Sequence, residues 1–254
     1  MALTRENRMT VAAHRGDSYN CFENTMTAFK KALESGADMI ETDVRLSKDG
    51  YVVIMHDDTV NRTTNGSGKV CELTLSQLKE LNAGNKIAPE EVPTFEEFIE
   101  WASKTELTLN IEIKEYYSEE NRERCEKCIE DVIDLAEKYN MASRIVLNSF
   151  DAWILEYVYK KYQKKYPLHG FYPYSIMNNV TISPDEYLYC ACIFDDGNKE
   201  LYDYLTKKGI EPWIGAGVTQ GQRFKLCYEY GARLVTTNNP SDAIEKLKNI
   251  DKEV

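Results

Sequence analysis

Apolar residues along the chain form short continuous runs that alternate with stretches of helical spacing. A run of about four to eight apolar residues, bounded by polar residues or glycine, is typical of a strand buried on both faces. Such runs occur at residues 9–13, 38–46, 107–113, 144–148, 166–171, 187–193, 211–214 and 234–237. The pattern therefore predicts eight main strands.

Between these runs, apolar residues recur every three or four positions, which predicts amphipathic helices. The first helix would begin after Asn24, a candidate N-cap, and end at Gly36. Its inner stripe would consist of Met26, Phe29, Ala32 and Leu33. The other predicted helices lie at residues 75–81, 93–101, around 129–136, 152–162, 199–207, 222–230 and 241–249.

Strands that alternate with helices pair in parallel through crossover connections. Eight of them favour a closed (β/α)8 barrel, the TIM barrel, over an open sheet, and such barrels commonly use about 250 residues as one domain. We therefore expect an α/β fold with a single domain from residue 1 to residue 254. We also predict a small insertion after the second strand. The signals are a tight turn at 48–50, a return strand at 51–55 and a polar excursion at 57–93.

The charge balance narrows the range of partners. The formal net charge is -11 at pH 7, whereas binding a nucleic-acid backbone requires an extended basic surface, so we expect no nucleic-acid partner.

No run approaches the roughly 18 apolar residues of a transmembrane segment, and no apolar segment follows the basic residues of the N-terminus. Seven scattered cysteines, an odd number, fit reduced thiols better than a disulfide framework. These features predict a cytoplasmic protein.

Two pairs of cysteines are candidates for chemistry. Cys125 and Cys128 form a C-x-x-C, but it lies in a charged run that leads into a helix, whereas thioredoxin-like chemistry places the motif after a strand. Cys190 and Cys192 share one face of a predicted strand, where burial as small apolar side chains is expected. We interpret both pairs as structural.

Polar residues at the ends of the first strands indicate where a site lies. In a (β/α)8 barrel the active site forms at the carboxyl ends of the strands. His14 ends the first strand, Glu41 and Asp43 lie late in the second, and Glu112 and Lys114 end the third main strand. Residues two apart on a strand point to the same face, so these side chains should converge on one mouth.

The three carboxylates favour a metal site. Acidic side chains that point into an apolar barrel are costly unless they are neutralised. Glu41, Asp43 and Glu112 would offer oxygen ligands without any cysteine, a set that favours Mg²⁺ or Ca²⁺. In the alternative, Glu41 and Asp43 face solvent and Glu112 pairs only with Lys114. The convergence of both acidic pairs with His14 favours the metal.

Histidine and basic residues point to a phosphate ester. His14 and His56 are two of three histidines. Near a metal site, one can remove a proton from an attacking hydroxyl while the other protonates a departing alkoxide. The planar guanidinium of Arg15 can bind two phosphate oxygens, and Lys114 can pair with phosphate. We interpret the third histidine, His169, as structural.

Several motifs occur in a fixed order. They are His14-Arg15-Gly16, Glu23-Asn24-Thr25, Glu41-Thr42-Asp43-Val44, Asp49-Gly50, His56-Asp57, Arg62-Thr63-Thr64 with Gly66 and Gly68, Pro93-Thr94-Phe95 and Asn110-Ile111-Glu112-Ile113-Lys114. Together they resemble the signature of the glycerophosphodiester phosphodiesterase family, densely over residues 11–114 and more thinly afterwards. The resemblance implies a TIM barrel with the excursion as the family's insertion. It also implies a divalent ion on Glu41, Asp43 and Glu112, and His14 and His56 as the catalytic pair.

The chain departs from the family pattern at two places. Phe22 stands where proline usually precedes Glu-Asn-Thr, which affects the entry loop rather than the catalytic groups. The segment 213–217 lacks the polar residues that usually follow Trp213. Phe150 and Trp213 are candidates for an apolar wall beside the alcohol part of the substrate, with ordinary packing at the barrel mouth as the alternative.

The resemblance implies metal-dependent hydrolysis of a small glycerophosphodiester to sn-glycerol 3-phosphate and an alcohol, with two histidines as general acid and base. One alternative is a phospholipase D-like enzyme that acts on lysophospholipids. The tyrosine-rich stretch at 157–174, with Tyr187 and Tyr189, could line a track for the acyl chain, although tyrosines this plentiful more often serve packing. Another is a non-catalytic phosphodiester-binding homologue. The oligomeric state, the head group and the choice between Mg²⁺ and Ca²⁺ stay open.

Overall fold

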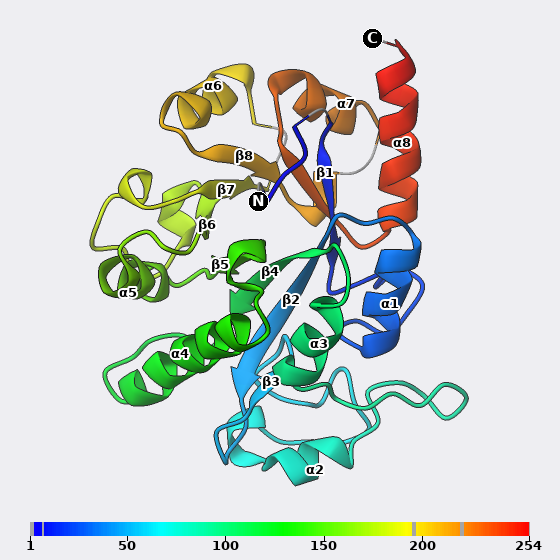
Figure 1. Ribbon diagram of the computed structural model, residues 1–254, viewed down its shortest axis with the longest axis vertical. Helices are drawn as coiled ribbons and strands as arrows, with labels where there is room; N and C mark the ends of the chain where they lie inside the picture. Colours follow the sequence, from blue (N-terminus) through cyan, green and yellow to red (C-terminus); the bar gives the residue numbers. More distant parts are fainter. Residues whose placement is uncertain (1–2, 7, 195–196, 219–220, 254) are drawn as a thin grey trace.

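The structure, a computed structural model, describes residues 3–6, 8–194, 197–218 and 221–253. Eight parallel strands close into a barrel, because β1 pairs with both β2 and β9. The barrel strands are β1 (Thr10–His14), β2 (Met39–Leu46), β4 (Thr108–Ile113), β5 (Ile145–Asn148), β6 (Leu168–Tyr172), β7 (Cys190–Ile193), β8 (Glu211–Ile214) and β9 (Leu234–Thr237). The predicted (β/α)8 barrel is confirmed (Figure 1).

Helices connect the strands and cover the outside of the barrel, apart from the short α2, which belongs to the insertion after β2. They are α1 (Met26–Glu34), α2 (Leu75–Lys79), α3 (Phe95–Ala102), α4 (Arg122–Lys138), α5 (Ala152–Tyr162), α6 (Lys199–Lys207), α7 (Gly221–Tyr230) and α8 (Pro240–Glu253). Figure 1 shows α8 running alongside β1, where the barrel closes. Within the described part of the chain, no helix combines the length and the apolar character needed to cross a membrane.

The predicted N-cap of α1 is wrong by one residue. Thr25 caps the helix, because its hydroxyl oxygen accepts a hydrogen bond from the backbone N–H of Ala28. Asn24 has a φ of 58°, and its side chain donates to Asp43 on β2 instead. The asparagine that looked like a helix signal therefore belongs to the acidic cluster inside the barrel.

Apolar side chains fill the barrel on both sides of its wall. The large outer core lies between the strands and the helices and includes Phe29, Phe98, Ile129 and Leu155. A smaller cluster of buried residues comprises Leu3, Ala12, Met39, Val146, Cys190, Trp213 and Leu234. Because these residues recur on strands around the barrel, they form its inner apolar layer. The clustered carboxylates Glu41, Asp43 and Glu112 lie beyond this layer, toward the carboxyl ends of the strands.

The insertion after β2 has a small core of its own. A short strand, β3 (Val52–Ile54), pairs antiparallel with β2 and starts this region, whose loops and α2 lie at the lower end of the view in Figure 1. Its core consists of Val53, Met55, Val60, Val70, Leu78, Ala83 and Val92. His56 follows β3 directly, so the insertion carries this histidine to the barrel.

The cysteine pairs are buried as the sequence predicts. Cys125 and Cys128 are free thiols within α4, and burial raises the pKa of both. Cys190 and Cys192 are free thiols on β7, and burial raises their pKa values as well. Thiols protonated in this way are poor nucleophiles, which supports a structural role for both pairs.

Candidate active site

A cavity of about 330 Å³ opens at the carboxyl ends of the barrel strands. Seven of the nine predicted site residues line it: His14, Arg15, Glu41, His56, Glu112, Lys114 and Phe150. Asp43 is fully buried immediately behind them. These groups come from β1, β2, β4, the start of the insertion and the end of β5, so the predicted convergence on one mouth is found.

The three carboxylates form one compact cluster. Glu41, Asp43 and Glu112 are buried, and each offers an oxygen atom that lies within 4.8 Å of the others. Burial raises the pKa of Glu41, and the neighbouring charge of Asp43 raises it further. Burial likewise raises the pKa of Glu112, although Lys114 opposes the shift. Three negative charges this close are stable only with compensating positive charge.

Asp43 is the centre of this cluster. Its Oδ2 accepts a hydrogen bond of 2.9 Å from Asn24 and lies 3.3 Å from Nε of Arg15. Its Oδ1 lies 3.4 Å from Nζ of Lys114 but accepts no hydrogen bond. A buried carboxylate oxygen without a hydrogen bond, inside a set of oxygen ligands, fits a hard divalent cation.

His14 is held by the far end of the chain. Its Nδ1 lies 2.6 Å from the amide oxygen of Asn238, which can only accept, so Nδ1 carries the hydrogen and Nε2 is the basic atom. Nε2 lies 3.9 Å from Glu41. Burial, and next the positive charge of Arg15, lower the pKa of His14, so the ring is neutral and able to accept a proton at neutral pH.

His56 is paired with a carboxylate. Its Nδ1 lies 2.7 Å from Oδ1 of Asp57. Burial lowers the pKa of His56, while Asp43 and Asp57 oppose this shift by favouring the protonated ring. Arg45 fixes the loop, because it donates hydrogen bonds to the carbonyl oxygens of both His56 and Lys114. The histidine and the lysine are thus positioned by one guanidinium.

Arg15 lies at the edge of the cavity in a network of charges. Its Nη1 donates to Glu23 at 2.9 Å, and Arg62 donates to both oxygens of the same carboxylate. Gly16 makes the turn beside it possible, because φ is 80° and a Cβ there would lie 2.6 Å from the carbonyl carbon of Ala28. Arg15 is therefore fixed beside the carboxylates and can bind an anion that enters the cavity.

Aromatic rings form one wall of the cavity. The rings of Phe150 and Phe171 are stacked with centroids 3.6 Å apart, and Phe194 stacks on Phe171 at 5.5 Å. Phe150 and the half-exposed Phe194 therefore supply the apolar wall, with Nζ of Lys114 at 5.6 Å from the Phe150 ring.

Trp213 and Tyr157 lie away from this wall, in agreement with the packing alternative for each. Trp213 does not line the cavity; it is fully buried in the inner apolar layer, where its indole N–H donates to Glu211. Tyr157 of the tyrosine-rich stretch stacks on Trp153 on the outside of the barrel and donates to Glu130. Neither is a wall residue, because each already has packing partners away from the mouth.

The sequence interpretation missed a polar floor of the cavity. Asn110, Asn148 and His169 line it from β4, β5 and β6, and His169, which we interpreted as structural, is 2% exposed. Strand alternation could have identified Asn110, which lies two residues before Glu112 and so shares its face. Asn238 could not be identified in this way, because only barrel closure brings it to His14.

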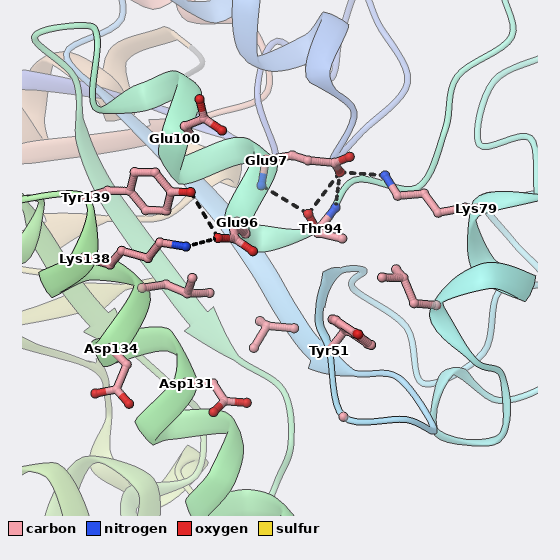
Figure 2. Close-up of a pocket in the computed structure, with 14 residues that line it drawn as sticks. Tyr51, Lys79, Thr94, Glu96, Glu97, Glu100, Asp131, Asp134, Lys138 and Tyr139 are labelled. Atoms are coloured by element: carbon pink, nitrogen blue, oxygen red, sulfur yellow. Dashed lines mark hydrogen bonds and ion pairs between the residues drawn. The ribbon is translucent and has the colours of Figure 1, made fainter.

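A second, larger hollow of about 630 Å³ lies away from the mouth. Figure 2 shows it between α3, α4 and the β3 turn, with acidic residues around it. Its principal charges are already paired: Glu97 binds Lys79 and the cap residue Thr94, and Glu96 binds Lys138. The chemistry is therefore concentrated at the barrel mouth.

Comparisons with known proteins find relatives in sequence and in fold. A glycerophosphodiester phosphodiesterase of Caldanaerobacter subterraneus subsp. tengcongensis is 44% identical over 158 residues. The match spans 59% of this chain and 61% of that relative. The solved structure of a glycerophosphodiester phosphodiesterase from Agrobacterium tumefaciens has a TM-score of 0.77 at 21% identity, covering 93% of this chain and 99% of the other.

A second solved structure contains a reaction product. It is an Oleispira antarctica phosphodiesterase in complex with sn-glycerol-3-phosphate, with a TM-score of 0.79 at 22% identity over 96% of this chain and 97% of the other. Residues 14–176, which include the three carboxylates and all three cavity histidines, match the model of the glycerophosphoryl diester phosphodiesterase family. This chain therefore belongs to that family.

Proposed function

We propose that the protein hydrolyses small glycerophosphodiesters to sn-glycerol 3-phosphate and an alcohol in a metal-dependent reaction. The observation that carries the proposal is one cavity in which His14, His56, Arg15 and Lys114 lie beside a cluster of three carboxylates. Phosphodiester hydrolysis needs these groups together: proton transfer at two oxygens and stabilisation of negative charge on the phosphoryl group. The described barrel would act as one catalytic domain.

Glu41, Asp43 and Glu112 would hold a divalent cation, Mg²⁺ or Ca²⁺. A bound cation supplies Lewis-acid stabilisation of a phosphoryl oxygen and lowers the pKa of a bound hydroxyl. Arg15 and Lys114 flank the carboxylates at 3.3 Å and 3.4 Å from Asp43. These two side chains would bind the remaining phosphate oxygens and stabilise the extra charge of the transition state.

The two histidines have different partners, which supports different roles. His14 bonds to a neutral amide and lies near Arg15, so its neutral form is favoured and it would act as the general base. Burial lowers the pKa of His56 as well, but His56 bonds to the carboxylate of Asp57, which opposes this shift and would stabilise the imidazolium, so His56 would donate a proton to the departing alkoxide. The same assignment applies whether the attacking oxygen belongs to water or to the glycerol 2-hydroxyl.

The aromatic wall is the reason to keep a lysophospholipid as the second candidate substrate. Phe150 and Phe194 offer an apolar surface beside the site, and Phe194 is 49% exposed at the mouth. An acyl chain lying there would bury apolar surface that a choline or ethanolamine group leaves exposed. We place the enzyme in the cytoplasm, in the metabolism of lipid-derived glycerophosphodiesters, a setting that the free thiols of Cys125 and Cys128 support.

The proposal is tested by release of glycerol 3-phosphate from glycerophosphocholine and glycerophosphoethanolamine, with EDTA and then with added Mg²⁺ or Ca²⁺. We expect EDTA to abolish turnover and one of the cations to restore it. A parallel assay with lysophosphatidylcholine distinguishes the lipid substrate. If no substrate turns over with any cation while glycerol 3-phosphate still binds, the protein is a non-catalytic binder and the proposal is wrong.

A further inference from the structure

One guanidinium on the insertion holds two carboxylates at once. Arg62 donates to both oxygens of Asp57, from Nε at 2.8 Å and from Nη2 at 2.9 Å. It also donates to both oxygens of Glu23, from Nη1 and Nη2, each at 2.8 Å. Four of its five N–H groups are thereby used in two forked pairs. Forked pairs fix direction as well as distance, so both carboxylates are held in a defined geometry.

The two carboxylates belong to different parts of the molecule. Asp57 and Arg62 are in the insertion after β2, whereas Glu23 lies in the loop between β1 and α1. The two parts pack closely, because Glu23 on one side and His56 and Thr63 on the other line a gap of only about 10 Å³. Arg62 therefore ties the insertion to the barrel.

Each carboxylate in turn holds a side chain that lines the cavity. Oδ1 of Asp57 accepts a hydrogen bond of 2.7 Å from Nδ1 of His56, which leaves Nε2 of the ring for proton transfer. Oε1 of Glu23 accepts a hydrogen bond of 2.9 Å from Nη1 of Arg15. His56 and Arg15 line the cavity, whereas Asp57, Glu23 and Arg62 lie behind them. Arg62 thus reaches the site through its two carboxylates.

The network keeps its charges at neutral pH. Hydrogen bonds from Arg62 are the main cause that lowers the pKa of Asp57. Burial alone would raise the pKa of Glu23, but the hydrogen bonds from Arg62 and the charge of Arg15 lower it to about 2. The side chain of Arg62 is nevertheless 48% exposed, and exposed ion pairs contribute little to the free energy of unfolding. Arg62 therefore contributes geometry more than stability.

Arg45 anchors the same loop in a different way. It donates hydrogen bonds to the carbonyl oxygen of His56, so it fixes the main chain. The direction of the imidazole ring depends instead on Asp57, and the direction of that carboxylate depends on Arg62. A main-chain anchor alone is not sufficient for proton transfer, because a displacement of about 1 Å can cost a large part of the rate.

We propose that Arg62 is a positioning residue that aligns the His56–Asp57 pair of the insertion with Arg15 of the barrel, through Glu23. This role rests on the proposed function, in which His56 protonates the departing alkoxide. The oxygens bound by Arg15 and the oxygen protonated by His56 belong to one phosphoryl group, so the two side chains must keep a fixed separation. Arg62 sets that separation, because the carboxylates that hold them share its guanidinium.

The test compares two esters of glycerol 3-phosphate. The alkoxide of glycerophosphocholine needs a proton to depart, whereas the phenolate of the p-nitrophenyl ester does not. In Arg62→Ala we expect kcat to fall by about 10-fold or more on glycerophosphocholine and by less than about 3-fold on the p-nitrophenyl ester, with each KM within about 2-fold of wild type. This pattern should match that of His56→Ala rather than that of His14→Ala.

Two further measurements separate positioning from folding. Guanidinium ion at millimolar concentration, too dilute to unfold the protein, should restore part of kcat in Arg62→Ala. Arg62→Lys should retain little activity on glycerophosphocholine, because an ammonium is a point charge that cannot form two forked pairs. When Asp57→Asn is already present, the added change Arg62→Ala should lower kcat by less than about 3-fold, since both side chains act through His56.

A matched control is Arg122→Ala, which removes an exposed arginine that pairs with Glu126 within α4. It should leave kcat on both esters unchanged. We expect the Tm of Arg62→Ala to lie within about 4 °C of wild type. An equal loss of kcat on both esters, or no loss, would overturn the positioning role. A large rise in KM with kcat preserved would also overturn it, because Arg62 would then contact the substrate directly.

Turnover by the wild type distinguishes failure of this inference from failure of the proposed function. If the wild type hydrolyses both esters while Arg62→Ala loses the same fraction of kcat on each, the positioning role alone is contradicted. If the wild type releases glycerol 3-phosphate from neither ester, the proposed function is contradicted, and the role of Arg62 with it.

Discussion

Nδ1 of His14 lies 2.6 Å from the amide oxygen of Asn238, a residue 224 positions further along the chain. His14 ends β1 and Asn238 follows β9, so the contact crosses the seam at which the barrel closes. Closure of the fold therefore sets the tautomer of the candidate general base. The amide raises the pKa of His14 less than burial and Arg15 lower it, and it carries no charge, in contrast to the carboxylate that holds His56.

Replacement of this amide by a carboxylate should shift the pH dependence of the reaction. In Asn238→Asp, the added negative charge should raise the pKa of His14, because it stabilises the imidazolium. A general base must be neutral, so the acidic limb of the kcat/KM profile should move to higher pH by about one unit or more. Asn238→Ala should instead lower the rate across the profile without this upward shift. An unchanged limb in the aspartate variant would remove His14 from the role of base.

The two histidines should respond differently to the leaving group. His14→Ala and His56→Ala should each lower kcat on glycerophosphocholine by about 10²-fold or more. With the p-nitrophenyl ester of glycerol 3-phosphate, whose phenolate departs without help, the loss in His56→Ala should shrink to below about 10-fold, while the loss in His14→Ala persists. The reverse pattern would exchange the two roles.

Local sequence pattern predicted most of this architecture because it depends on neighbouring residues. Strand β8, for example, has the same bounds in prediction and structure, residues 211–214. The pattern placed the carboxylates correctly as well, since alternation along β2 and β4 puts Glu41, Asp43 and Glu112 on one inner face.

Residues whose roles depend on distant partners were harder to predict. Asn24 has the side chain of a helix cap, yet its left-handed φ turns it toward Asp43. Trp213 is a candidate for the cavity wall from a family motif, with ordinary packing as the alternative. The depth of a side chain within the barrel depends on register, and Trp213 packs with its strand neighbour Leu234 in the inner layer. Such positions depend on how the strands are staggered around the barrel, which a local pattern does not contain.

The acidic cluster should oppose stability when no metal is bound. Burial and Asp43 raise the pKa of Glu41. Near neutral pH the folded protein must therefore either protonate Glu41 or keep its charge buried, and both cost free energy, whereas the unfolded chain exposes the ionised group to water at no such cost. Glu41→Gln removes this charge and should stabilise the metal-free protein by about 1 kcal/mol or more. The same change should abolish the rise in Tm that Mg²⁺ or Ca²⁺ produces in wild type. Thermal unfolding in EDTA and in each cation measures both effects, and a metal-free variant less stable than wild type would contradict the argument.

Glu23 should contribute stability that disappears in acid. Burial alone would raise its pKa, but hydrogen bonds from Arg62 and the charge of Arg15 outweigh burial and lower the pKa from 4.5 to about 2. The folded state therefore favours the carboxylate, and this contribution is present above about pH 4.5 and is lost as the pH falls toward 2. Denaturant unfolding at several pH values should show wild type more stable than Glu23→Gln by roughly 1–2 kcal/mol at pH 7, with the difference shrinking toward pH 3.

Glu34→Gln, which removes an exposed partner of Lys31, is the matched control and should change stability by less than about 0.5 kcal/mol. A difference for Glu23→Gln that stays constant with pH would mean that the side chain acts through packing rather than through its charge.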